Sequence, residues 1–171
     1  MLKLVGIAIV MTATAGILFS WQEKERARIR RLKELGRFLD RTYYAMETEH
    51  VRIIAYAQQY ETTEEVFSRT LKHLAELLRK NTYASGEEAW IAACKEEEKN
   101  WAFGQDAWEV LLSCGAALFG RNLAENLNML SGMQKRTEKI IEEESCQFAE
   151  KKKVFLPVGM LGGVMIIVIL L

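Results

Sequence analysis

The chain has 171 residues, enough for one domain with membrane segments, and its 23 basic residues balance its 23 acidic ones, which does not favour bulk nucleic-acid binding. Half of the residues are hydrophobic, which argues against disorder, and a single proline predicts an almost wholly helical protein. The three cysteines are widely spaced and form no CxxC, so neither a disulfide framework nor a zinc site is expected and a reducing compartment is favoured.

The first predicted element is a run without charge over residues 4–21. As a helix it is about 27 Å long, close to the hydrocarbon thickness of a bilayer, and it ends on Trp21, a typical interface residue. A cleaved signal peptide is the alternative, because residues 13–15 (Ala-Thr-Ala) resemble a cleavage site, and the domain would then be exported and tail-anchored. The dense basic block over residues 24–33 favours an uncleaved transmembrane helix.

The next helix is predicted to continue out of that segment. Apolar residues recur at spacings of three and four from Ile29 to Ile54, so the helix extends towards Tyr60, either in one piece or with a break. Thr62 and Glu65 have the spacing of a capping box, which predicts a further helix over residues 63–80.

Three more helices are expected before the end of the chain. Ser85 and Glu88 form a second capping box and predict a helix to about residue 98, followed by a break at residues 100–104. A largely apolar helix over residues 105–119 is expected at the centre of a bundle, with Gly120 as its C-cap glycine. Asn122 is predicted to cap a last long helix that continues into the C-terminal segment.

A second run without charge, residues 154–171, follows three lysines and is predicted to be a second transmembrane helix. A buried core helix is the alternative, but such a helix usually has a polar face. Basic residues flank both runs on the side of the intervening chain, so the positive-inside rule places residues 22–153 in the cytoplasm and both termini outside. The predicted domains are therefore residues 1–21, 22–153 and 154–171.

The predicted fold class is all-α, an antiparallel bundle of about five to six helices flanked by N- and C-terminal transmembrane helices. Small residues recur every four positions in the first run, and the second contains a GxxxG pair. Such residues let membrane helices approach closely, so the two runs are candidates to pack on each other or on other subunits. The candidate packing residues are Ala8, Thr12, Gly16, Gly159 and Gly163.

The sequence contains no motif that predicts an enzyme. A Walker-type phosphate loop, a GxSxG elbow and an HExxH pair are all absent, so neither catalytic residues nor a cofactor are expected. Glu47 and His50 have the E-x-x-H spacing of di-iron bundles, but the second pair that such sites need is missing. A solvated helix face is the preferred interpretation, and a membrane-tethered metal-binding bundle is an alternative.

Several features follow one another in a set order along the chain. They are the start MLKLVG before the first run, residues 46–49 (Met-Glu-Thr-Glu), residues 85–90 (Ser-Gly-Glu-Glu-Ala-Trp), residues 118–122 (Leu-Phe-Gly-Arg-Asn) and the lysine-flanked terminal run. Together they resemble the stage III sporulation protein AB family of endospore-forming bacteria over the full length. The motif positions of unknown role are Glu47, Glu49, Trp90, Gly120 and Asn122.

This resemblance implies a cytoplasmic domain like that of the type II secretion F protein, the inner-membrane platform of type II secretion and type IV pilus systems. The family belongs to the mother cell–forespore channel, or feeding tube. The resemblance thus implies a platform subunit on the mother-cell side, in the outer forespore membrane, that docks a stage III sporulation protein AA-type ATPase and meets other channel subunits or further copies of itself. A two-span helical sensor is an alternative, although the predicted topology leaves almost no chain outside the membrane to sense.

Overall fold

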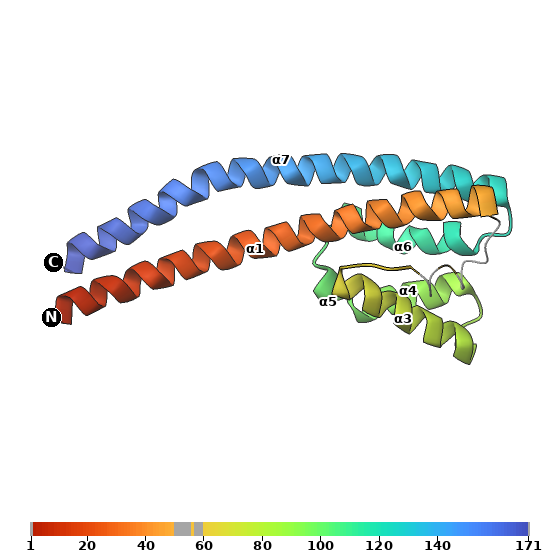
Figure 1. The fold of residues 1–171 in the computed structure, drawn as a ribbon, viewed down its shortest axis with the longest axis horizontal. Helices are drawn as coiled ribbons and strands as arrows, with labels where there is room; N and C mark the ends of the chain where they lie inside the picture. Colours follow the sequence, from red (N-terminus) through yellow and green to blue (C-terminus); the bar gives the residue numbers. More distant parts are fainter. Residues whose placement is uncertain (1, 50–55, 57–59, 171) are drawn as a thin grey trace. The chain divides into compact units, whose positions relative to one another are not determined.

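The computed structural model describes residues 2–49, 56 and 60–170, and every regular element within that part is a helix (Figure 1). The prediction of an all-α protein is confirmed. The elements in chain order are α1 (Leu2–Tyr44), the π-helix η1 (Ala45–Glu49), α3 (Glu65–Lys80), α4 (Gly86–Glu96), α5 (Glu98–Trp101), α6 (Gln105–Phe119) and α7 (Leu123–Leu170).

The chain divides into two compact units. We call residues 1–29 and 143–171 the terminal unit, and residues 30–142 the bundle unit. The predicted domain boundaries after residues 21 and 153 depend on membrane crossing, which this division does not address, so they stay predictions. Within the described residues, no helix is both long enough and apolar enough to cross a membrane.

Aromatic rings form the centre of the bundle unit. Phe38 of α1 is stacked on Trp90 of α4, with ring centroids 6.0 Å apart and ring planes 10° apart. Phe67 of α3 lies 5.1 Å from Phe38 and 5.4 Å from Trp101, which is fully buried. The helix α4 packs against both α3 and α6. These contacts join α1, α3 and α4 around one hydrophobic core.

Local capping chemistry sets several helix ends as predicted. The Ser85 hydroxyl accepts a hydrogen bond from the Glu88 N–H at 3.1 Å, and α4 begins at the next residue, Gly86. The carbonyl of the Asn122 side chain accepts from the Ala124 N–H at 3.1 Å, and α7 begins directly after it. The predicted helix over residues 105–119 is confirmed as α6, and many of its side chains are buried.

The start of α3 differs from the prediction. It begins at Glu65, and its N-cap residue Glu64 makes no hydrogen bond with its side chain, so the capping box predicted from Thr62 and Glu65 is wrong. Thr62 instead accepts a hydrogen bond from the Glu64 N–H at 3.1 Å. A tertiary contact competes with the box, since Glu64 is paired with Arg30 of α1 at 3.5 Å. The core face of α3 is as predicted at Val66, Phe67, Thr70, Leu71 and Leu74, which are all buried.

The helix expected to run towards Tyr60 can be followed without interruption only to Glu49, and Tyr56 is again helical. The α-helical part of α1 ends at Tyr44 and passes into η1, a π-helix over Ala45–Glu49. Tyr60 itself is not helical. The remaining part of the predicted helix, residues 50–55 and 57–59, lies outside the described residues.

The end of α6 at Gly120 is as predicted, but its conformation is not. Gly120 has φ −63° and ψ 153°, which is extended rather than left-handed, so it is not a C-cap glycine of the expected kind. A Cβ at this position would overlap the side-chain oxygen of Asn126 and lie 2.9 Å from its Cγ. Glycine is therefore needed here for space and not for backbone freedom.

The terminal unit brings the first part of α1 beside the last part of α7. The ring of Trp21 is stacked on that of Phe155, with centroids 5.1 Å apart, and lies 6.0 Å from that of Phe148. Arg28 is paired with Glu144 of α7 at 2.5 Å and with Glu25 of its own helix at 2.9 Å. These ring and charge contacts hold the two segments together.

Candidate functional site

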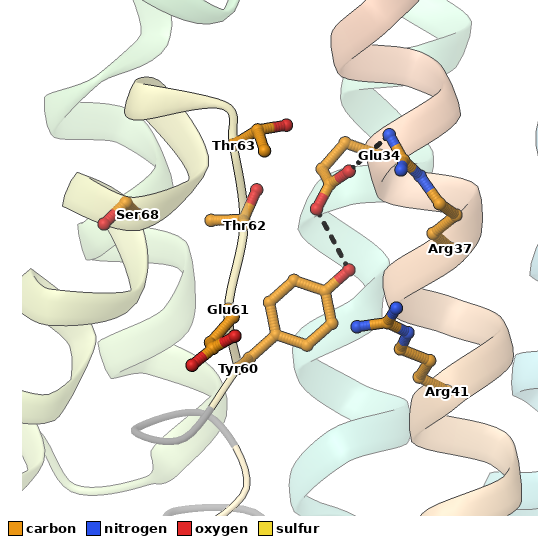
Figure 2. A pocket seen from close by; sticks show the side chains of 8 residues that line it. All are labelled: Glu34, Arg37, Arg41, Tyr60, Glu61, Thr62, Thr63 and Ser68. Carbon is orange, nitrogen blue, oxygen red and sulfur yellow. Dashed lines mark hydrogen bonds and ion pairs between the residues drawn. The ribbon is translucent and has the colours of Figure 1, made fainter.

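A polar cleft of about 600 Å³ lies along one face of α1 in the bundle unit (Figure 2). The helix contributes side chains at spacings of three and four, Glu34, Arg37 and Arg41, which places them on one face. The opposite wall is the extended segment 60–63 with Ser68 of α3. A helix face carrying two arginines thus faces a wall rich in hydroxyl groups.

A buried carboxylate organises this cleft. The side chain of Glu34 is only 3% exposed, and its two oxygens are both engaged. The Tyr60 hydroxyl donates to one oxygen at 3.1 Å, and the Arg37 guanidinium is paired with the other at 2.7 Å. A buried charge is tolerated only when it is paired and hydrogen-bonded in this way. Burial, and then the negative charge of Glu34, raises the pKa of Tyr60, which therefore stays a hydrogen-bond donor.

The two arginines differ in their partners. Arg37 forms an ion pair with Glu34, while the Arg37 side chain remains 58% exposed. The guanidinium of Arg41 lies over the ring of Tyr60, 5.7 Å from its centroid. This is a cation–π distance. Tyr60 is thus held from two sides by α1, and Figure 2 shows its ring between the extended segment and the helix.

The motif residue Trp90 has a structural role. Its side chain is 1% exposed, and its ring N–H donates to the Leu111 carbonyl of α6 at 2.7 Å. Gly115 lies against it, since a Cβ at that glycine would come within 3.0 Å of the indole. Trp90 therefore fixes the distance between α4 and α6.

Gly120 and Asn122 meet at the turn between α6 and α7. The Gly120 carbonyl accepts a hydrogen bond from the Asn126 side chain at 2.9 Å, and Asn122 caps α7. Gly86, in the motif before Trp90, reaches the same end of α6, because a Cβ there would overlap the Phe119 ring. The structure thus gathers these motif positions at the contacts of α4 with α6 and of α6 with α7.

The motif glutamates lie elsewhere, on the π-helix η1. Glu47 is exposed, while the side chain of Glu49 and the whole of His50 lie outside the described residues. The predicted pairing of Glu47 with His50 is therefore not described. Within the described residues, no group of three His, Cys, Asp or Glu side chains is arranged to hold a metal ion.

The candidate packing residues of the terminal unit are described only in part. Thr12 and Gly16 are exposed, and a Cβ at Gly16 would meet no atom within 4 Å. The side chain of Ala8, and Gly159 and Gly163 beyond their place in α7, lie outside what the structure describes. Close packing through these positions stays a prediction.

The cysteines fall into two environments. Cys94 and Cys114 are buried, as predicted, whereas Cys146 is exposed. Burial raises the pKa of Cys94 well above its usual value and raises that of Cys114 to about 12. Because the thiolate is the reactive form, only Cys146 is expected to react readily with a thiol reagent.

The sequence did contain one signal of the cleft. Glu34 stands between Leu32 and Leu35, which are both buried, so a charged residue occupies the predicted apolar face of α1. Such a residue needs a partner, but the partner Tyr60 is 26 positions away along the chain. Spacing within one helix cannot reveal it.

The part of the chain that the structure describes is helical throughout its regular elements, which defines the class as a helical-bundle protein. The chain belongs to the stage III sporulation protein AB family, whose model matches residues 3–171. No curated protein and no solved structure matches it. Membership of the family implies a role at stage III of sporulation.

Proposed function

We propose that the chain is a non-enzymatic platform subunit of the mother cell–forespore channel. The terminal unit would hold it in the membrane, with both termini outside, and the bundle unit would dock a secretion-type ATPase in the cytoplasm. Family membership supports the sporulation role. The absence of a phosphate loop from the sequence fits a subunit that relies on a separate ATPase.

Exposed apolar side chains on the terminal unit carry the membrane part of this proposal. They are Ile17, Phe19, Val154, Phe155, Val158, Leu161 and Met165, each at least 50% exposed. Exposed apolar side chains gathered in number on one unit favour a contact with lipid or protein. Lys151, Lys152 and Lys153 are exposed directly before the last five, as the positive-inside rule expects at a cytoplasmic boundary.

Cys146 allows the topology to be measured in the natural chain. A membrane-impermeant maleimide should label it only after the cells are permeabilised, because the proposed topology places it in the cytoplasm. The Cys146→Ser variant is the control, since it retains the buried Cys94 and Cys114. The labelling is done in vegetative cells that produce the chain, because an exported domain would there face the medium. Labelling of these intact cells would show that the domain is exported and would contradict the proposal.

The docking part is tested by purification of the tagged full-length protein from sporulating cells. An AA-type ATPase should co-purify in near-stoichiometric amount, while the purified chain alone should hydrolyse no nucleotide. A complex with other channel subunits but without any ATPase would limit the role to assembly.

A further inference from the structure

One arginine that lines the cleft beside α1, Arg41, has no carboxylate partner among the described residues. Arg37 is neutralised by Glu34 at 2.7 Å, and Arg30 is paired with Glu64 at 3.5 Å. For Arg41, the described part of the chain provides only the face of the Tyr60 ring. A guanidinium in that position keeps its N–H donors available in the plane away from the ring.

The geometry suits a planar anion. Arg37 and Arg41 are one helical turn apart on α1, a rise of about 6 Å, so their outer N–H groups border the same opening. Thr62, Thr63 and Ser68 line the facing wall, where the Thr63 hydroxyl points towards α1 and the Ser68 hydroxyl points away from it (Figure 2). Arginine forks bind carboxylates through paired N–H···O bonds, and hydroxyl groups can complete the coordination of the second oxygen.

The carboxylates of the cleft disfavour a doubly charged ligand. Glu34 is already in the cleft and Glu61 borders it. A doubly charged phosphate would be repelled by these carboxylates, whereas one carboxylate balances the charge of Arg41. Figure 2 shows the Glu61 side chain turned away from the two arginines, which leaves the opening to α1 free.

We propose that this cleft receives the side chain of an aspartate or glutamate from the docked partner protein, bound by Arg41 and by the outer N–H groups of Arg37. Glu34 and Tyr60 act as positioning residues. Glu34 is paired with Arg37 and accepts a hydrogen bond from the Tyr60 hydroxyl, and the ring of Tyr60 packs against the guanidinium of Arg41. The inference rests on the proposed docking function and names the surface that performs it.

The test measures binding of the purified AA-type ATPase to the full-length chain in detergent by interferometry. Arg41→Gln should weaken binding about tenfold and Arg41→Glu more, because a buried partner charge loses its counterion. Arg79→Gln removes the same charge from an exposed site on α3 outside the cleft and should change binding less than about twofold. Glu61→Gln should leave binding unchanged or tighten it.

Equal weakening by Arg79→Gln and Arg41→Gln would overturn the inference, since the effect would then come from overall charge. Weakening by Glu61→Gln would also overturn it. The decisive support is a reciprocal change: an acidic residue of the partner replaced by arginine should restore binding to Arg41→Glu. Inorganic phosphate is added as a competitor in the same binding measurement. If it displaces the ATPase at low concentration, the cleft is a phosphate site, and the inference is overturned as well.

If the unaltered chain fails to bind the ATPase, the docking function fails and the cleft is judged separately. A photo-crosslinking amino acid at Thr63 of the full-length chain then reports in sporulating cells which segment occupies it. A crosslink that disappears with Arg41→Glu and returns with charge reversal in the captured segment supports the inference. Crosslinks that do not depend on Arg41, or none at all, overturn it.

Discussion

Replacement of Trp90 by phenylalanine tests whether the hydrogen bond between α4 and α6 matters to stability. The change keeps a ring for stacking on Phe38 but removes the N–H that donates to the Leu111 carbonyl at 2.7 Å. That hydrogen bond contributes about 1 kcal/mol, and the smaller ring loses about another 1 kcal/mol of buried contact in a side chain that is 1% exposed. The free energy of unfolding should therefore fall by about 2 kcal/mol.

The measurement is the thermal unfolding of the full-length chain followed by circular dichroism. For a unit of this size, about 2 kcal/mol corresponds to a fall in Tm of roughly 8 °C. Trp108→Phe is the matched control, because Trp108 also lies on the bundle but is only half-buried, and its Tm should change by at most about 3 °C. A Trp90→Phe variant that melts within about 2 °C of the unaltered chain would refute the reasoning.

Three further substitutions test the packing and the charges of the bundle unit in the same assay. Gly36→Ala should raise Tm by about 3 °C, because its Cβ would meet no side chain closer than 3.7 Å while the helix gains about 0.7 kcal/mol; a lower Tm would show that α1 is tighter than described. Gly120→Ala should lower it by roughly 8 °C, since its Cβ overlaps the Asn126 side chain and overpacking costs about 2 kcal/mol. Hydrogen bonding to Arg69 lowers the pKa of Glu97 below 4.5, so the pair stabilises the fold above that pH. Glu97→Gln should therefore be less stable than the natural chain near neutral pH and equally stable in strong acid. A difference in stability that persists in acid would contradict the charge mechanism.

Local chemistry explains which helix ends the sequence could predict. Ser85 and Asn122 cap their helices through their own side chains within three residues, so the signal and its effect lie in the same short stretch. The hydrophobic spacing of α6 is likewise a property of one helix. Such elements can be predicted from a short stretch of sequence without reference to the rest of the chain.

Long-range contacts explain what the sequence could not show. Thr62 has the local pattern of a cap, yet the segment stays extended while Tyr60 bonds to Glu34 and Glu64 pairs with Arg30. Each of these contacts joins residues far apart along the chain, and together they compete with a helix start at residue 63. The cleft exists only because of this extended segment, so neither could be predicted from spacing alone.

The motif residues that stabilise the fold differ from the groups that remain available to contact a partner. Trp90, Gly120 and Asn122 are engaged within the fold, in a buried hydrogen bond, a close approach and a helix cap. Replacing them should disturb stability first and docking only as a consequence. A contact with a partner requires groups that the fold leaves available, and Arg41 is such a group because its N–H donors are not used by a carboxylate of the described chain. A substitution that abolishes docking at unchanged Tm should therefore fall at the cleft and not at Trp90, Gly120 or Asn122.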